Sequence, residues 1–422
     1  MLDINLIRKD KKLVMKALHD RNMKFDIDHL LDLDLEKRRL QMKVDELHAK
    51  QNKASDEIAK LEGSKKQQAI LDIKGTSERL KDLESKCNKL DEELEKLMYE
   101  LPNIPRPDVK VGKNESENEV IKKVGEPTKF DFDPKDHLAL GEKLDLIDTK
   151  RAGKVSGSRF NYLKRELVLL EFALARFVID ELTKDGFIPV IPPQIVSEKS
   201  MQAMGYLAHG GEEETYHFAK DKQYFIGTSE QSVGPMHMDE IFKESDLPKR
   251  YIAFSTCFRR EAGSYGKDTY GILRQHQFDK LEMFVLAKPE ESDKEHEFLL
   301  GLEERLVKAL NLPYQVVKMC TGDLGDPAAR KYDIETWLPS QKKYRETHSA
   351  STCTDFQARR LNIKYRDTEK NKNEFVHTLN GTGFAIGRIL IAIMENNQQK
   401  DGSIKIPEVL WGYCNIKEIK RS

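Results

Sequence analysis

The chain has 422 residues, a length that predicts two or three domains and a sizeable buried core. Its composition, 38% hydrophobic and 34% charged, is typical of a globular protein with a highly charged surface. With 71 Lys and Arg against 72 Asp and Glu, the formal net charge is -1, so overall charge supplies no general attraction for nucleic acid.

Cysteine usage and hydropathy exclude several further classes of protein. The five cysteines are Cys87, Cys257, Cys320, Cys353 and Cys414. Their odd number and the lack of a C-x-x-C pair argue against a disulfide framework or a zinc site, and favour reduced thiols in a cytoplasmic protein. Residues 1–5 do not resemble the start of a secretory signal. The sequence also contains no run of roughly 18 apolar residues, so we expect no membrane span.

Residues 32–101 carry an apolar repeat with alternating steps of three and four. Its first half consists of Leu33, Leu40, Val44, Leu47, Ala54, Ile58 and Leu61. Beyond Gly63 it resumes as Ile73, Leu80, Leu83, Cys87, Leu90, Leu94, Leu97 and Leu101. Such spacing places the apolar side chains on one stripe of a helix. The sequence therefore predicts two long helices, joined by a turn near Gly63 and folded as an antiparallel coiled coil that ends before Pro102.

The coiled coil alone does not indicate RNA binding. At about 30–35 residues per helix and 1.5 Å per residue, the arm would reach roughly 50 Å. Its acidic and basic residues are balanced, with a weak positive cluster of Lys60, Lys65 and Lys66 near the turn. A dimerisation or scaffold coiled coil is the favoured interpretation of this segment by itself.

A change of composition after the arm separates it from a second domain. We place an N-terminal domain at residues 1–110, a Pro-, Gly- and Asn-rich linker at 111–135, and the second domain at 136–422. Within that domain a helix-like segment at 162–184 is followed by short strand-like runs at 187–191, 251–254, 280–286 and 314–319. Short turns rather than helical crossovers separate these runs, which favours an α+β fold on an antiparallel sheet.

The triplet Arg259-Arg260-Glu261 follows a strand-like run and opens a Gly-rich loop that extends to Gly271. An arginine at such a loop can bind a phosphate bidentately, and a carboxylate can accept from an adenine amino group. By itself, however, such a triplet is far more often an exposed ion pair in a hairpin than a nucleotide site. Neither G-x-G-x-x-G nor G-x-x-x-x-G-K-[ST] is present, so neither of those loops would hold a nucleotide.

An ordered set of blocks around the triplet resembles the class II aminoacyl-tRNA synthetases. Gly186–Pro193 is similar to their first signature motif, Phe258-Arg-x-Glu to the second, and Gly381–Arg388 to the third. Intervening blocks resemble the seryl-tRNA synthetase family: Thr228-Ser-Glu-Gln231, Arg274-Gln-His-Gln-Phe-Asp-Lys280, Met319-Cys-Thr-Gly-Asp-Leu-Gly325, Asp355-Phe-Gln-Ala-Arg-Arg360, His377-Thr-Leu-Asn-Gly381 and Ile406-Pro-Glu-Val-Leu410. The resemblance implies a class II catalytic domain, an antiparallel β-sheet flanked by helices, behind an N-terminal tRNA-binding domain with its coiled-coil arm.

The resemblance also implies an ATP site. The matching positions are Arg259, Arg260, Glu261, Gln275, Phe278, Glu346, Thr347, His348, Ser349 and Arg388. By this match Arg259 would hold the α-phosphate, Glu261 the adenine amino group and Arg388 the γ-phosphate. Phe278 would stack on the adenine, and Gln275 would contact ATP chiefly through its backbone. From His348 to Cys353 the chain departs from the Ser-Cys-Ser-Asn run of many relatives.

Catalysis and metal binding follow from the same match. Arg259 and Arg388 are the expected catalytic residues, and Glu346 with Ser349 is expected to bind Mg²⁺ together with ATP, since this ion prefers oxygen ligands. No zinc is expected. The reaction would be in-line attack of the serine carboxylate on the α-phosphate, which needs no general base because the nucleophile is already ionised.

For L-serine, the family positions fall on Thr228, Glu230, Glu282 and Thr382. A carboxylate suits the substrate ammonium, and a hydroxyl can meet that of the substrate. A polar site that alanine would leave unpaired can favour serine over alanine by a factor of about 10⁴.

The family's partners are implied in the same way. They are tRNA(Ser), ATP, L-serine and a second copy of the chain in a cytoplasmic homodimer without membrane attachment, and charging of tRNA(Sec) is left open. Two alternatives stay open at this point: a paralogue that transfers activated serine to an acceptor other than tRNA, and a non-catalytic RNA-binding relative.

Overall fold

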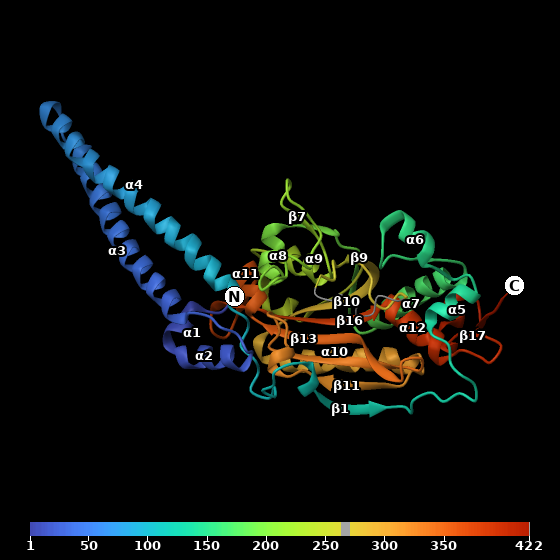
Figure 1. Ribbon diagram of the computed structural model, residues 1–422. Helices are drawn as coiled ribbons and strands as arrows, with labels where there is room; N and C mark the ends of the chain where they lie inside the picture. The colour runs from blue at the N-terminus through green and yellow to red at the C-terminus, as the bar shows by residue number, and fades with distance from the viewer. Residues whose placement is uncertain (263–270, 422) are drawn as a thin grey trace. The chain divides into compact units, whose positions relative to one another are not determined.

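The computed structural model describes residues 1–262 and 271–421, without the side chains of residues 68–72, and the chain divides into two compact units (Figure 1). The first unit consists of Leu2–His19 and Met23–Pro102; the second contains Met1, Asp20–Asn22 and the chain from Asn103 onward. Part of the predicted Gly-rich loop, residues 263–270, lies outside the described residues.

The first unit is helical. Its elements are α1 (Ile4–Lys9), α2 (Lys11–Asp20), α3 (Ile27–Ile58) and α4 (Gly63–Glu100). The turn between α3 and α4 falls where the sequence predicts it, since α4 begins at Gly63. Gly63 has a φ of 62°, a left-handed value that glycine adopts at little cost.

Contacts between α3 and α4 show that the two long helices are antiparallel. Early α3 residues meet late α4 residues and the reverse: His29 lies 3.9 Å from Glu93, Gln41 3.3 Å from Cys87, His48 2.9 Å from Glu84 and Gln51 3.1 Å from Ser77. Every predicted seam residue is buried or half-buried, whereas most intervening residues are exposed. The coiled-coil prediction is confirmed.

The second unit is built on an eight-stranded sheet, as counted over the described residues. Its strand order is β1 (Glu119–Val124), β11 (Tyr314–Lys318), β12 (Arg330–Leu338), β13 (Lys343–Thr354), β16 (His377–Ala385), β10 (Gln277–Ala287), β9 (Lys249–Phe258) and β4 (Ile188–Val190). All neighbouring pairs are antiparallel except β4 with β9. The α+β fold with an antiparallel sheet, predicted from the sequence, is confirmed.

Smaller elements surround this sheet. The remaining helices are α5 (His137–Lys143), α6 (Thr149–Ser156), α7 (Glu166–Thr183), α8 (Glu198–Met204), α9 (Glu230–Val233), α10 (Ser292–Ala309), α11 (Phe356–Leu361), α12 (Ile386–Asn396) and α13 (Trp411–Cys414). The remaining strands are β2 (Ile147–Asp148), β3 (Tyr162–Leu163), β5 (Ile195–Ser197), β6 (His217–Phe218), β7 (Gln223–Phe225), β8 (Ile241–Lys243), β14 (Lys364–Asp367), β15 (Lys372–Phe375), β17 (Ile404–Lys405) and β18 (Glu418–Ile419).

Two segments differ from the sequence-based expectation. The stretch predicted as a linker contains β1, which pairs with β11 at the edge of the sheet. Five of its six residues are exposed, so it lacks the alternation of apolar and polar residues that reveals a half-buried strand. The helix expected from residue 162 begins only at Glu166, because Tyr162–Leu163 pair with β2 instead.

The two faces of the large sheet have different roles. Helices α7, α10 and α12 cover one face and share its apolar core (Figure 1). On β10, Leu281, Met283 and Val285 belong to this core, whereas Phe284 and Leu286 belong to a separate apolar cluster with α8 and α11 residues. Because side chains alternate along a strand, the face opposite the three helices is left for the polar side chains of β10, β13 and β16.

Two glycines of the third motif allow the helices to approach closely. A Cβ on Gly381 would lie 3.0 Å from Met283 and 3.3 Å from Glu303, and one on Gly383 would lie 3.0 Å from Val178. Both positions therefore favour glycine, and they fix β16 against α10 and α7.

No helix within residues 1–262 and 271–421 combines the length and the apolar character that crossing a membrane requires.

Candidate active site

A cavity of about 630 Å³ lies on the sheet face opposite α7, α10 and α12. It is lined by all but two of the residues that the sequence predicts for ATP, serine and magnesium binding. Those that line it are Thr228, Glu230, Arg259, Glu261, Gln275, Phe278, Glu282, Glu346, Thr347, Ser349, Thr382 and Arg388. The second and third signature motifs, far apart in the sequence, therefore meet in one concave site with residues of the blocks around them.

Strand alternation explains most of this convergence. On β10, Lys280 and Glu282 are two residues apart and both line the cavity; Asn380 and Thr382 do the same on β16. Because β10 and β16 are neighbours, these side chains form one polar patch at the centre of the sheet.

The connection between β9 and β10 places the second motif at one end of the cavity. The strands pair up to Phe258 opposite Gln277, so Arg259 is the first residue beyond the ladder. Its Nε donates to the carbonyl oxygen of Gly227 over 3.1 Å, and its guanidinium lies 5.4 Å from the ring centroid of Phe278. The guanidinium is thereby held over the cavity by two separate elements.

At this same end Glu261 accepts a hydrogen bond from Arg274 Nη1 over 2.7 Å and forms an ion pair with it.

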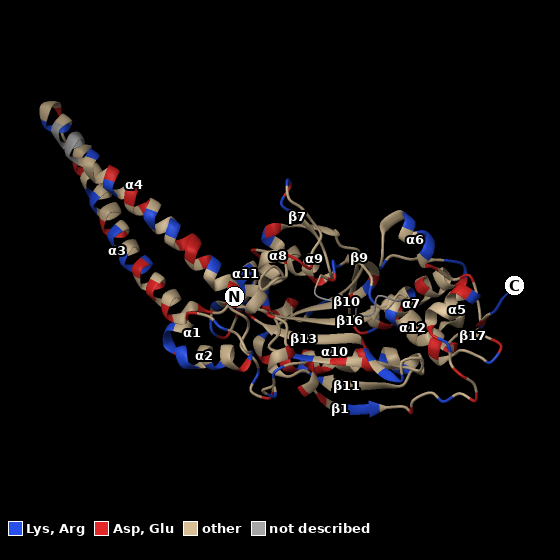
Figure 2. Ribbon diagram, viewed as in Figure 1, with Lys and Arg blue, Asp and Glu red and all other residues tan. Residues whose placement is uncertain are grey.

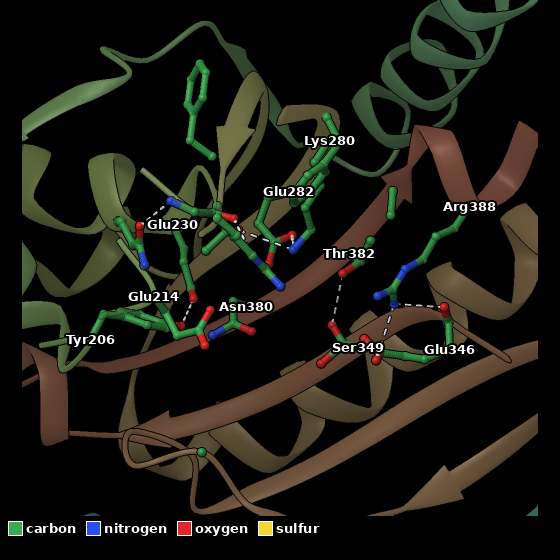
Figure 3. A pocket seen from close by; sticks show the side chains of 18 of the residues that line it. Tyr206, Glu214, Glu230, Lys280, Glu282, Glu346, Ser349, Asn380, Thr382 and Arg388 are labelled. Carbon is green, nitrogen blue, oxygen red and sulfur yellow. Dashed lines mark hydrogen bonds and ion pairs between the residues drawn. The ribbon is translucent and has the colours of Figure 1, made fainter. Parts of the chain in front are cut away.

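A second arginine and a carboxylate form the other charged group of the cavity. Arg388, in the first turn of α12, donates to the carbonyl oxygen of Glu346 over 2.9 Å and lies 3.3 Å from its carboxylate (Figure 3). Burial alone would raise the pKa of Glu346, but Arg388, Lys331 and Arg259 together hold it at about 2. Glu346 is therefore ionised at neutral pH, and the hydroxyl of Ser349 lies on the same strand and lines the same cavity.

The inner end of the cavity concentrates buried carboxylates. Glu230 contacts the hydroxyl of Tyr206, and Glu282 forms an ion pair with Lys280 (Figure 3). From the helical side of the sheet, Glu303 accepts from the backbone N–H of Thr382 over 2.8 Å. Burial, reinforced by Glu282, raises the pKa of both Glu230 and Glu303, and burial also raises that of Glu282, where Lys280 opposes the rise. Such a pocket favours a small cationic group, which would relieve the repulsion.

Two predicted ATP-binding residues do not line the cavity. Arg260 is exposed, and its backbone N–H donates to the carbonyl oxygen of Glu214. On β13 the side chain of His348 alternates with those of Thr347 and Ser349, so it lies on the helical side, edge-on to Phe384 at 5.5 Å between centroids. Burial lowers the pKa of His348 to about 3, which leaves it neutral. We therefore leave both residues out of the site proposed below.

Several lining residues were not singled out from the sequence. They are Tyr206, Lys280, Lys331 and Asn380. Lys280 ends the block Arg274–Lys280 and stands two positions before Glu282 on a predicted strand. Because alternate residues of a strand face the same side, this spacing could have placed Lys280 in the site. Tyr206 and Lys331 lie outside the quoted blocks, and Asn380 stands in one next to the glycines of the third motif.

Comparison with known proteins gives an independent view of the same residues. The seryl-tRNA synthetase N-terminal domain matches residues 1–105, and the tRNA synthetase class II core domain (G, H, P, S and T) matches residues 216–397. The serine–tRNA ligase of Dictyoglomus turgidum is 44% identical over 423 aligned residues, which span 100% of this chain and 99% of the relative. The chain belongs to the seryl-tRNA synthetase family.

Solved structures of the family agree along the whole chain. Seryl-tRNA synthetase from Pyrococcus horikoshii, crystallised with ATP, is 40% identical with a TM-score of 0.90 and coverage of 100% of both chains. The cytoplasmic serine–tRNA ligase of Naegleria fowleri, in complex with AMP, is 32% identical with a TM-score of 0.85, covering 100% of this chain and 99% of that one. The family, the fold class and the enzyme class predicted from the sequence are confirmed: the chain is a class II aminoacyl-tRNA synthetase that ligates serine to tRNA.

Proposed function

We propose that the 630 Å³ cavity is where L-serine is activated by ATP before transfer to tRNA(Ser), with the cavity residues in the roles given below. The observation that carries this proposal is the division of charge within one cavity. Arg259 and Arg388 offer guanidinium groups suited to phosphates, whereas Glu230 and Glu282 offer buried carboxylates suited to an ammonium group.

At the nucleotide end, Arg259 contacts the α-phosphate and Arg388 the terminal phosphate. Phe278 supports the adenine, and Glu261 accepts from its amino group. The serine carboxylate attacks the α-phosphorus, the bond to the β-phosphate oxygen breaks, and pyrophosphate leaves with the negative charge that develops. Fixed cations stabilise the transition state without reorganisation, which accounts for most of the rate enhancement expected in such a site.

Magnesium fits the donor groups near Arg388. Glu346 is held ionised, and with the hydroxyl of Ser349 it offers the hard oxygen ligands that Mg²⁺ takes from a protein when substrate phosphates supply others. When bound, Mg²⁺ would neutralise phosphate charge during the transfer. Glu346 and Ser349 are the residues we propose to hold it.

At the inner end, Glu230 and Glu282 bind the substrate ammonium, and Thr228 and Thr382 approach its polar atoms. Of the described residues, none donates a hydrogen bond to Glu230 Oε2, although that atom is buried. A buried acceptor of this kind favours a ligand that brings its own donors. Alanine would leave the hydroxyl partners unpaired, whereas the extra methyl group of threonine would have to be excluded by shape.

In the second step a hydroxyl of the terminal ribose of tRNA attacks the carbonyl carbon of the adenylate. The bond from that carbon to the phosphate oxygen breaks, AMP leaves, and the hydroxyl proton passes to solvent. We propose that the coiled-coil arm binds the tRNA. Figure 2 shows Lys and Arg interspersed with Asp and Glu along both α3 and α4, rather than gathered in one block. Dispersed positive charge suits recognition of RNA by shape and backbone. We also propose that the enzyme acts in the cytoplasm.

The activation step is tested by amino-acid-dependent exchange of pyrophosphate into ATP. With the purified chain, Mg²⁺ and ATP, we expect serine to support exchange about 10⁴-fold better, in kcat/KM, than alanine. Faster exchange with any other amino acid would contradict the assignment of the pocket. Addition of total tRNA and labelled serine should then give acid-precipitable product.

We also propose that the chain forms a homodimer through the edge of the sheet at β4. Large apolar side chains are exposed on α7 and around β4: Leu169, Phe172, Ile188, Ile191 and Ile195. Phe172 is 65% exposed and Ile191 80%, so burial against a second copy would remove considerable apolar surface from water. In the described part of the chain β4 pairs on one side only, with β9.

Replacing Phe172 with glutamate is expected to shift the chain from dimer to monomer. The change places a charge within the apolar surface and removes one of its largest side chains. Sedimentation equilibrium measures the mass against the 48.8 kDa of a single chain. The matched control is Ile121→Glu, an exposed apolar residue on β1 at the opposite edge of the sheet, which should leave the dimer intact. A monomeric wild type, or an unaffected F172E variant, would refute this surface.

A further inference from the structure

We propose that Lys280 is the positioning residue for serine: its buried ammonium group orients the Glu282 carboxylate and the Thr228 hydroxyl together, and thereby sets affinity for the substrate. The inference rests on the proposed function, because it assigns the partners of Lys280 to the serine site. Lys280 would act through these two residues rather than on the reacting atoms.

The geometry joins the three residues directly. Lys280 Nζ lies 2.5 Å from Glu282 Oε2 and 3.2 Å from Thr228 Oγ1. The side chains of Lys280 and Glu282 are only 11% and 3% exposed, so solvent screens the pair little. Figure 3 shows the contact between Lys280 and Glu282, with Thr382 on the neighbouring strand β16, where it pairs with Glu282.

The protein backbone makes this arrangement rigid. Lys280 and Glu282 project from the same face of β10, which is paired on both sides, with β9 and with β16. The backbone register shifts between Leu281 and Glu282 opposite β16, next to the pair. Thr228 comes from the segment before α9, so a single ammonium group links two separate parts of the chain.

The charges around Glu282 make a cation at this place necessary. The groups that face Glu282 are Lys280 on its own strand, Arg259 at the end of β9, Glu230 on α9, Glu303 on α10, and the thiol of Cys257 on β9. Two of them are carboxylates and would oppose ionisation of Glu282. Lys280 is in direct contact with it and favours the ionised form, which is the form that accepts hydrogen bonds from a substrate ammonium.

The contact with Thr228 also has a directional consequence. Because the ammonium group can only donate, Thr228 Oγ1 accepts from Lys280, and the hydroxyl hydrogen of Thr228 is left to point elsewhere. Thr228 lines the cavity, so this hydrogen can serve a substrate oxygen. Lys280 thus orients the Glu282 carboxylate as an acceptor for the serine ammonium group and the Thr228 hydroxyl as a donor to a serine oxygen.

The main test is Lys280→Met in serine-dependent pyrophosphate exchange, because methionine keeps much of the length of the side chain without its charge. We expect the KM for serine to rise at least tenfold while the KM for ATP changes less than threefold. Without Lys280 the pKa of Glu282 rises, so the acid limb of kcat/KM for serine should move to higher pH. A role in packing alone would leave the position of that limb unchanged.

A double-mutant cycle with Glu282→Gln shows whether Lys280 acts through Glu282. In the E282Q background, K280M should lower kcat/KM for serine by threefold or less, since the carboxylate on which it acts is gone. An equal loss in both backgrounds would overturn the proposal.

The matched control is Lys331→Met, which removes another lysine of the cavity lining. Lys331 lies 3.2 Å from Asp333 on β12, and its loss should leave the acid limb for serine in place. If K280M does not fold, Lys280→Arg decides: it keeps the charge, so a displaced acid limb in that variant would contradict the proposal. A wild type that does not prefer serine would refute the proposed function itself, which is a different outcome.

Discussion

Deletion of residues 32–100 is expected to abolish the charging of tRNA while serine-dependent pyrophosphate exchange stays within about threefold of wild type. The deleted segment contains most of α3, the turn and all of α4, and the apolar seam of the two helices is packed between them. All residues that line the cavity lie at or beyond Tyr206. Activation should therefore survive, and only the step that needs tRNA should be lost.

The antiparallel geometry makes this deletion feasible. Its two ends belong to the same end of the coiled coil, where His29 of α3 lies 3.9 Å from Glu93 of α4, so a short glycine linker can join residue 31 to residue 101. Equal loss of exchange and charging would contradict the assignment of tRNA binding to the arm.

A milder control separates the fold of the arm from its charge. Lys60, Lys65 and Lys66, near the turn, can be changed together to serine without touching the seam. The KM for tRNA should rise and its salt dependence should weaken, because fewer phosphate contacts release fewer counterions. The parameters for serine and ATP should not change.

The arm and the sheet differ in how much the sequence reveals. The seam of α3 and α4 was predictable because a three-four repeat has one structural meaning over this length. β1 was not, since Val120 and Ile121 are adjacent and both exposed, and neither alternation nor an apolar run marks the strand. An edge strand with little burial leaves almost no trace in the pattern of hydrophobic residues.

Within the site, strand parity is the information that motif matching omits. Thr347, His348 and Ser349 are consecutive in the chain, but only Thr347 and Ser349 line the cavity, because His348 faces α7, α10 and α12 from the other side of the sheet. The sequence departs from the Ser-Cys-Ser-Asn run of many relatives from the same residue, His348, onward.

Glu303 shows a limit of sequence analysis. It stands beside Glu304 in an amphipathic helix and looks like one of two solvated glutamates, yet it is fully buried and bonded to the backbone of Thr382. The hydrogen bond joins residues 79 positions apart, so only the packing of α10 against β16 reveals it.

Arg259→Ala is expected to lower kcat for pyrophosphate exchange about 10²- to 10³-fold, which corresponds to about 3 kcal/mol of lost transition-state stabilisation. Arg259 is held over the cavity by Gly227 and Phe278, and Arg388 and Glu346 stand at the nucleotide end of the same cavity. Negative charge shifts onto phosphate oxygens as pyrophosphate leaves, so a fixed guanidinium contributes more to the transition state than to the ground state. The loss should therefore appear in kcat more than in the KM for serine.

The neighbouring arginine supplies the matched control. Arg260→Ala removes the same chemical group one position further along, where the side chain is exposed and does not line the cavity. The backbone N–H of residue 260 can still donate to Glu214, so the loop keeps that contact and exchange should stay within threefold of wild type. A thermal unfolding curve for each variant separates loss of chemistry from loss of fold. Near-normal exchange in R259A would remove Arg259 from the reaction, and a loss in R260A as large as in R259A would show that the loop, rather than one guanidinium, carries the effect.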